Sequence, residues 1–179
     1  MTLKIPKYRY EEIEKKVVDL YKRHGIHNIP IDPFKILENS GFVLIPFSKF
    51  DDNNRPKEVN DKNDAFSFYS PKHKTHFIIY NDNKPLPRIR FTLMHELGHI
   101  VLGHKGESDL ARREADYFAG YSLAPTPLIS AYASEDIYNL SSTFWISKDC
   151  AEVRSSCYKN WLQYEKYLKV HEIELINFF

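Results

Sequence analysis

The feature that most constrains this chain is an apolar stretch from Arg90 to His104, with the sequence RFTLMHELGHIVLGH. Its apolar side chains recur at three- and four-residue steps, at Phe91, Met94, Leu97, Val101 and Leu102. That spacing predicts a helix with one apolar face that packs against the protein core. Two histidines and a glutamate in such a helix need partners, because burying them alone costs several kcal/mol.

Within that stretch, residues 95–99 read H-E-L-G-H, an H-E-x-x-H sequence. On a helix His95 and His99 lie one turn apart on the same face, so both imidazoles can bind one metal ion. Glu96 projects about 100° around the helix from His95, which places it beside the ion, where it can take a proton from water. We therefore predict that His95 and His99 bind zinc (Zn2+) and that Glu96 is catalytic. Two chance histidines on an exposed helical turn are the alternative, which the apolar surroundings disfavour.

A catalytic zinc site usually has a third protein ligand, with water in the fourth position. The longer motif that continues with x-x-G-x-x-H is excluded, because the corresponding positions are Leu102 and Lys105. The third ligand should therefore come from the next helix, whose sequence over residues 111–125 is ARREADYFAGYSLAP.

The chain has 179 residues, 42% of them hydrophobic and 27% charged, an ordinary globular composition. Its net charge of +1 gives no reason to expect nucleic acid or an anionic membrane as a partner. The first 16 residues lack the apolar segment of a signal peptide, and no run is long enough to span a membrane. Cys150 and Cys157 would lie about 10 Å apart on a helix, too far for a disulfide. We expect a cytoplasmic protein.

Hydrophobic periodicity predicts an α+β fold. Helices are expected over residues 9–24, 34–39 and 108–122, with Gly25, Asp32 and Ser108 as end signals, and in the metal-binding stretch between Pro87 and Gly103. Strands are expected over residues 42–47, 65–69 and 75–80, as a three-stranded antiparallel sheet. Residues 128–179 read as helical, with one turn signal at residues 140–142. We expect a catalytic core over residues 1–125 and a helical C-terminal subdomain, residues 126–179, packed on it.

Several segments, in order along the chain, resemble the ImmA/IrrE family of zinc metallopeptidases. They are IPIDPFKILENSGFVL (residues 29–44), Asn81, RFTLMHELGHIVLGH, EADYFAGYSLAP (residues 114–125) and TFWISKDCAEVR (residues 143–154). The resemblance implies a small zincin-like domain in which the two motif histidines and a glutamate of the next helix hold zinc, as in gluzincins. Members are typically encoded beside a helix-turn-helix repressor of a phage or mobile element. The implied activity is site-specific cleavage of that repressor, which relieves repression.

The chain departs from the family at the usual position of the third ligand, which is Arg112 here and cannot bind a cation. Asp116 lies one turn further on and about 40° around the helix, so it faces nearly the same way. Glu114 is longer but points about 200° away on a regular helix, and His104 is off the ligand face of an unbroken helix. We favour Asp116 as the third ligand, with Glu114 as the alternative. Asp116 could instead hold the ring N–H of a ligand histidine.

The favoured hypothesis is a zinc endopeptidase that cleaves a helix-turn-helix repressor. A second hypothesis is a protein that sequesters a repressor or antitoxin without cutting it, to which Arg112 gives weight. A third is a zinc hydrolase of a small substrate. Direct nucleic-acid binding by the C-terminal helices is not expected, since their few basic residues are interleaved with acidic ones.

Overall fold

The computed structural model describes residues 4–51, 55–60, 62–106, 108–164 and 167–179; residues 1–3, part of both the predicted core and the segment inspected for a signal peptide, lie outside that set. The first helices are α1 (Lys7–His24) and α2 (Pro33–Asn39), followed by strand β1 (Val43–Pro46) and a short 3-10 helix, η1 (Phe47–Lys49). Strands β2 (Ala65–Ser70) and β3 (Thr75–Tyr80) precede six helices: α3 (Leu86–Leu102), α4 (Asp109–Leu123), α5 (Thr126–Tyr132), α6 (Ile137–Phe144), α7 (Lys148–Tyr164) and α8 (Val170–Phe178). The mixed α+β class predicted from the sequence is confirmed.

The helix ends follow the local signals in the sequence. Gly25 ends α1 in the left-handed conformation, with φ 62°, where a residue without Cβ is not strained. Asp32 caps α2 by accepting hydrogen bonds from the backbone N–H groups of Phe34 and Lys35. Ser108 caps α4 by accepting one from Ala111. These three predicted boundaries are confirmed.

The sheet is mixed, so the prediction of an antiparallel sheet is wrong for one of its two pairings. The strand order is β1-β3-β2; β2 and β3 form the predicted antiparallel hairpin, but β1 pairs with β3 in parallel, with Val43 opposite Phe77. A parallel pair needs a long crossover between its strands, and the segment with η1 and β2 provides it. Strand β3 is therefore central, and its Ile78 and Ile79 are buried.

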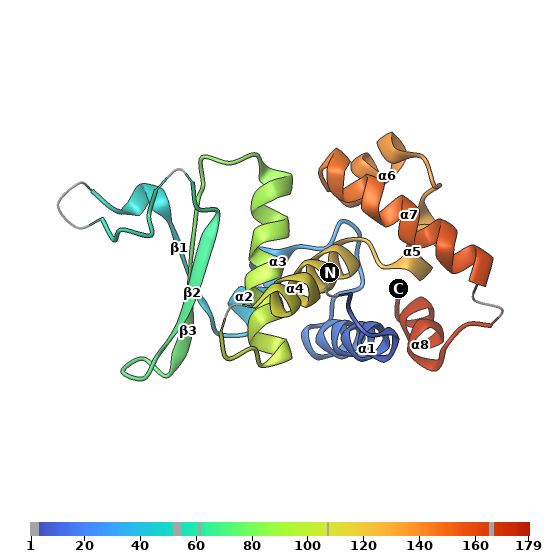
Figure 1. Ribbon diagram of the computed structural model, residues 1–179, viewed down its shortest axis with the longest axis horizontal. Helices are drawn as coiled ribbons and strands as arrows, with labels where there is room; N and C mark the ends of the chain where they lie inside the picture. Colours follow the sequence, from blue (N-terminus) through green and yellow to red (C-terminus); the bar gives the residue numbers. More distant parts are fainter. Residues whose placement is uncertain (1–3, 52–54, 61, 107, 165–166) are drawn as a thin grey trace.

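Helix α3 lies between the sheet on one side and α1 and the C-terminal helices on the other, with α4 packed across it (Figure 1). Its buried face includes Leu93, Met94 and Leu97. A Cβ built on Gly98 would lie 3.1 Å from Phe118 Cδ1 and 3.2 Å from Ala115 Cα, so the glycine allows α4 to approach α3 closely. The fold thereby brings the sequence that follows Arg112 directly against the H-E-x-x-H turn.

The described part of the C-terminal region, residues 126–164 and 167–179, is mainly helical, as predicted, whereas residues 165–166 of the predicted helical segment lie outside the described residues. The turn predicted at residues 140–142 was wrong. These residues lie within α6, where Ser142 donates its hydroxyl hydrogen bond to the carbonyl of Asn139. Helix α8 returns to lie beside α1 (Figure 1). The division after residue 125 stays a prediction. None of the helices described here is long and apolar enough to cross a membrane.

Candidate metal centre

The two motif histidines face each other on consecutive turns of α3. The Nε2 atoms of His95 and His99 are 3.1 Å apart. Two ligands of a tetrahedral zinc, each at about 2.0–2.1 Å from the ion, lie about 3.3 Å apart. The separation of the two nitrogens is therefore close to what a shared zinc ion requires.

The proton of His95 is fixed by Asp116 on α4. Asp116 Oδ1 lies 2.8 Å from His95 Nδ1. An ionised carboxylate only accepts hydrogen bonds, so Nδ1 carries the proton. In the neutral ring this leaves a lone pair on Nε2, the form of imidazole that binds a metal.

The proton of His99 is fixed in the same way through a second histidine. Glu114 Oε2 lies 3.1 Å from Nε2 of His104, and His104 Nδ1 lies 3.0 Å from Nδ1 of His99. Because Glu114 accepts from Nε2, the Nδ1 of a neutral His104 is an acceptor and takes the proton of His99 Nδ1. His99 is therefore also left with a lone pair on Nε2.

The carboxylate at the end of this chain of hydrogen bonds is held ionised. Arg9 donates to both oxygens of Glu114, at 2.9 and 2.5 Å. This ion pair, with the contact from His104, keeps the pKa of Glu114 below its ordinary value despite the burial of the side chain. Arg9 thus helps to maintain the tautomers of His104 and His99 at neutral pH.

The Nε2 atoms of His95 and His99 face each other at 3.1 Å, and in these tautomers neither carries a proton that could form a hydrogen bond between them. A cation bound between the two nitrogens removes the repulsion of their lone pairs. The donor set, two neutral imidazoles with their other nitrogens hydrogen-bonded, fits zinc. The residues present are therefore compatible with the metal that the sequence implied.

Glu96 has a partner that sequence reasoning missed. Ser67, on β2, donates its hydroxyl hydrogen bond to Glu96 Oε2 at 2.6 Å. Strand β2 is an edge of the sheet. A serine in a strand carries no signal of such a role, because the contact exists only once β2 lies against α3.

Both carboxylates proposed as the third ligand contact histidine nitrogens on the side away from the Nε2 pair. Asp116 is on Nδ1 of His95, and Glu114 is on His104. Among the residues with a described placement, no third imidazole, thiol or carboxylate forms a ligand-sized cluster with His95 and His99. The identity of a third ligand stays a prediction, and the geometry gives Asp116 the orienting role weighed as its alternative.

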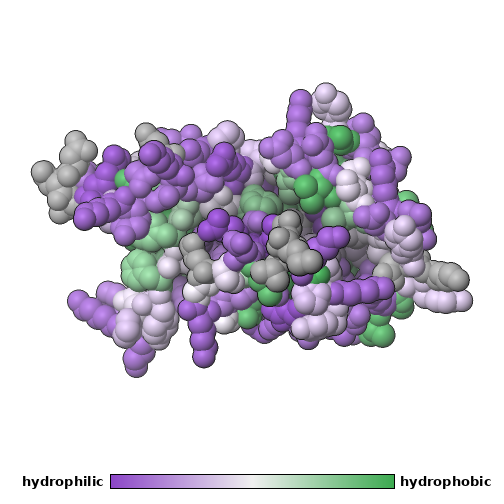
Figure 2. Space-filling model, in the orientation of Figure 1, coloured by the Kyte–Doolittle hydropathy of each residue, from purple (hydrophilic) through white to green (hydrophobic). Residues whose placement is uncertain are grey.

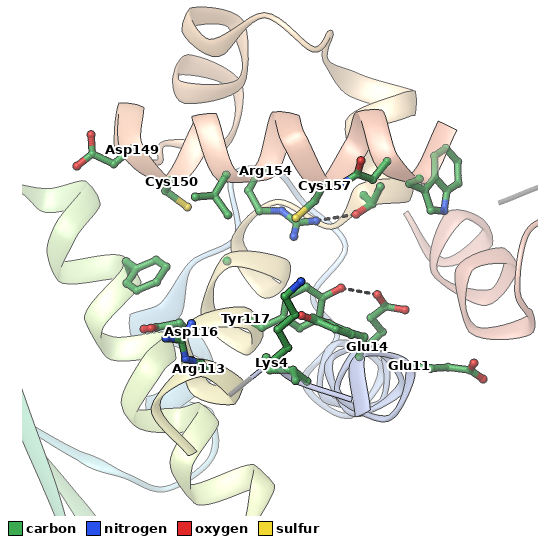
Figure 3. A pocket seen from close by; sticks show the side chains of 18 of the residues that line it. Lys4, Glu11, Glu14, Arg113, Asp116, Tyr117, Asp149, Cys150, Arg154 and Cys157 are labelled. Carbon is green, nitrogen blue, oxygen red and sulfur yellow. Dashed lines mark hydrogen bonds between the residues drawn. The ribbon is translucent and has the colours of Figure 1, made fainter. Parts of the chain in front are cut away.

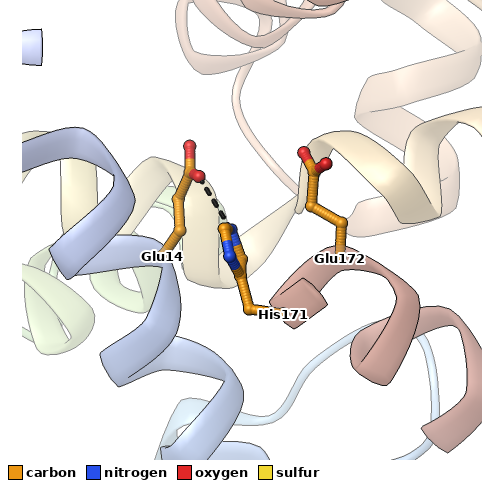
Figure 4. Close-up of side chains that lie close together, drawn as sticks. All are labelled: Glu14, His171 and Glu172. Atoms are coloured by element: carbon orange, nitrogen blue, oxygen red, sulfur yellow. Dashed lines mark hydrogen bonds and ion pairs between the residues drawn. The ribbon is translucent and has the colours of Figure 1, made fainter. Parts of the chain in front are cut away.

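A second cluster that sequence reasoning did not find joins α1 to α8: Glu14, His171 and Glu172 are buried, with potential ligand atoms within 4.8 Å of one another (Figure 4). Glu14 accepts hydrogen bonds from Tyr117 at 2.5 Å and His171 at 3.0 Å. Glu172 accepts from the Trp161 indole at 2.8 Å and a backbone N–H at 2.7 Å. All four carboxylate oxygens thus have protein donors, which favours an internal hydrogen-bonded cluster over a metal site.

Two cavities border the metal centre. A pocket of about 370 Å³ is lined by residues that include Ser67 and His99. A cleft of about 1780 Å³, here called the interhelical cleft, lies between α7 on one side and α1, α3 and α4 on the other (Figure 3). Asp116 lies in its wall, so the cleft reaches the residue that contacts His95.

Comparison with models of protein families matches the part of the chain that holds the metal centre. A sequence model described as the IrrE N-terminal-like domain (Peptidase_M78) matches residues 48–156, more than half of the chain. No curated protein matches the chain. The matched segment contains Ser67, all of α3 and all of α4, and with them the histidine pair and both carboxylates discussed above. The matched family indicates a metallopeptidase-type function, and the chain belongs to this family, the ImmA/IrrE family.

Proposed function

We propose that the protein is a zinc-dependent endopeptidase that cleaves a helix-turn-helix repressor and so relieves repression. The observation that carries the proposal is that the Nε2 atoms of His95 and His99 lie 3.1 Å apart, each with a lone pair. Each lone pair is left on Nε2 because the Nδ1 proton of the ring is hydrogen-bonded, by Asp116 in one case and by His104 in the other. Family membership supports a metallopeptidase-type activity. The repressor rests on the sequence resemblance, because family members are typically encoded beside one.

His95 and His99 would hold the zinc ion, which supplies Lewis-acid chemistry that acidifies water and polarises a peptide carbonyl. The carboxylate of Glu96, held by Ser67 through Oε2, accepts the proton of the attacking water. It then gives that proton to the nitrogen of the leaving amine. Asp116 and His104 keep the two ligand histidines in the tautomer that the reaction needs.

The size of the interhelical cleft favours a polypeptide over a small substrate. Pockets for small ligands typically enclose about 300–1,000 Å³, whereas this cleft encloses about 1780 Å³. The smaller pocket borders His99 and the cleft borders Asp116, so an extended chain at the metal centre has space on both sides. Strand β2, as an edge strand, offers backbone hydrogen bonds to such a chain.

The test uses the zinc-loaded protein and a purified helix-turn-helix repressor, chosen from those encoded near its gene. Mass spectrometry should find two complementary repressor fragments from a single cut. The Glu96→Gln variant should bind zinc as the wild type does, while cleavage falls about a hundredfold or more. Cleavage retained by that variant would remove Glu96 from the mechanism, and an intact repressor with the wild type would contradict the proposed substrate.

One observation keeps a second candidate function in view. The position of the family's usual third ligand is Arg112 here, which cannot bind a cation, and a site of two histidines holds zinc more weakly than one with three protein ligands. The second candidate is a protein that sequesters the repressor or an antitoxin without cutting it. In that case repressor and protein form a stable complex, and the repressor stays whole with and without zinc.

A further inference from the structure

The interhelical cleft contains a buried cation. Arg154, on α7, is 1% exposed, and Figure 3 shows it extending from α7 into the space between the helices. Its Nε donates to the carbonyl of Ala124 at 2.9 Å, and its Nη2 donates to the hydroxyl of Thr126 at 2.6 Å. Both partners are neutral. Arginine is always charged in proteins, so Arg154 places a full positive charge in the cleft wall.

That charge has no anionic partner within the described part of the chain. Arg154 forms no ion pair with a described residue, and its Nη1 donates no hydrogen bond to one. Glu14 lies on the opposite wall in Figure 3, but its two oxygens accept from Tyr117 and His171. Buried charges in proteins are normally paired, because desolvation disfavours them. Arg154 therefore lacks the counter-charge that its burial calls for.

Most of the other charged side chains of the lining that have no ion pair with a described residue are also positive. Lys4, Lys7 and Arg113 line the cleft and form no ion pair with a described residue. The acidic side chains of the lining are mostly engaged elsewhere: Glu11 pairs with Lys15 at 2.7 Å, Glu14 with His171, and Asp116 with His95. Asp149 is the exception, and it sits in the first turn of α7, where the helix dipole stabilises it. The cleft thus presents uncompensated positive charge.

Apolar surface accompanies this charge. Phe91, Val153 and Trp161 line the cleft, and Figure 2 shows hydrophobic side chains exposed between the region of the sheet and the C-terminal helices. A ligand that matches both features carries carboxylates and apolar side chains together. An acidic segment of a polypeptide has this chemistry.

We infer that the interhelical cleft binds an acidic segment of the protein substrate, with one carboxylate of that segment on Nη1 of Arg154. The inference rests on the proposed function, because Asp116 joins the cleft to the metal centre and makes the segment a neighbour of the scissile bond. The site would select substrates whose sequence is acidic on one side of the cut, with Arg154 as a specificity-determining residue.

The test uses two pools of short peptides with blocked ends and a neutral dye, in which random uncharged residues flank one central glutamate or one central glutamine. Binding is measured by fluorescence anisotropy with the zinc-loaded Glu96→Gln protein, so that cleavage does not interfere. The glutamate pool should bind about tenfold tighter than the glutamine pool, the value of a charge-assisted contact. Free glutamate at the same concentration should not displace it, because the site takes a polypeptide.

Arg154→Met should abolish the preference for glutamate, while Arg23→Met, on the far end of α1 and outside the cleft lining, should retain it. If Arg154→Met does not fold, the exposed Arg113→Met decides, with an expected loss of about two- to fivefold in the preference. Equal binding of the two pools, a preference that survives the decisive variant, or displacement by free glutamate would overturn the inference. If the protein cuts the repressor but shows no preference for the glutamate pool, only the inference about the cleft is refuted. If the protein prefers the glutamate pool but leaves the repressor uncut, only the proposed peptidase function is refuted.

Discussion

The close approach of α4 to the metal helix at Gly98 can be tested by adding one methyl group. In Gly98→Ala the new Cβ would lie 3.1 Å from Phe118 Cδ1 and 3.2 Å from Phe118 Cβ and Ala115 Cα. Carbon atoms in favourable contact are about 3.5–4.0 Å apart, and both neighbours are fully buried. Helix α4 must therefore move by a few tenths of an ångström.

The expected loss in the free energy of unfolding of Gly98→Ala is the difference between two opposing effects. Overpacking a buried contact costs about 1–3 kcal/mol, and the higher helix propensity of alanine returns about 1 kcal/mol. The net loss of about 1 kcal/mol corresponds to about 2–4 °C in melting temperature for a chain of this length. Because Asp116 and Glu114 lie on α4, the same movement should weaken zinc binding, by up to about tenfold.

Urea denaturation and calorimetric zinc titration measure both effects. Gly106→Ala is the matched control, since a Cβ there meets no atom within 4 Å; its stability should be unchanged or higher by about 0.4–1 kcal/mol. If Gly98→Ala proves as stable as Gly106→Ala and binds zinc as tightly as the wild type, then the close contact of α4 with α3 at Gly98 does not position the metal site.

Three further predictions follow from the contacts of the site and of the buried cluster. Asp116→Ala, which removes the acceptor of a ligand histidine, should lower zinc affinity about 10- to 100-fold in a calorimetric titration. Ser67→Ala should reduce turnover about tenfold through Glu96, with zinc affinity unchanged; equal losses in both would mean a general disturbance of the site. Glu14 has a pKa that burial raises but that its hydrogen bonds hold below the ordinary 4.5, so its stabilisation is complete above about pH 4.5 and is lost as pH falls through the lowered value. Denaturation across acidic pH should therefore show a shallower decline for Glu14→Gln than for the wild type.

The parts of the fold that could be predicted from the sequence depend on neighbouring residues. The caps at Asp32 and Ser108, the glycine that ends α1, and the β2–β3 hairpin all follow from local signals, and all were confirmed. The pairing of β1 with β3 was not predictable in the same way. Its direction depends on a crossover of the chain and on which edge of β3 is free, both of which are long-range properties.

The role of His104 shows how one local break changes a site. An unbroken helix would point this residue away from the ligand face of His95 and His99, so helical spacing does not predict it as a ligand. The helix instead ends at Leu102, and Gly103, with φ 71°, turns the chain in the left-handed conformation. His104 thereby returns to donate its backbone N–H to the carbonyl of His99 at 3.0 Å and to place its ring against that of His99. The glycine was visible in the sequence, but not the direction of the side chain that follows it.

The functions of Glu114 and Asp116 depend on the angle at which α4 crosses α3. Helical spacing predicts different directions for the two side chains, and in the structure they contact two different histidines, His95 and His104. The helical periodicity of the sequence does not reveal that each carboxylate contacts a histidine nitrogen on the side away from the Nε2 atoms of His95 and His99. Arg154 is a comparable case, because its burial arises only when α7 packs over the turn at Ala124.

The central claim is that one zinc ion lies between His95 and His99, and the anomalous scattering of a crystal of the zinc-loaded protein tests it most directly. A difference map calculated at the zinc absorption edge should show one peak, within bonding distance of Nε2 of both histidines. The side chains around that peak would also reveal whether Asp116 leaves His95 to become a third ligand. A peak at Glu14, His171 and Glu172 instead, or no peak at either cluster, would contradict the account.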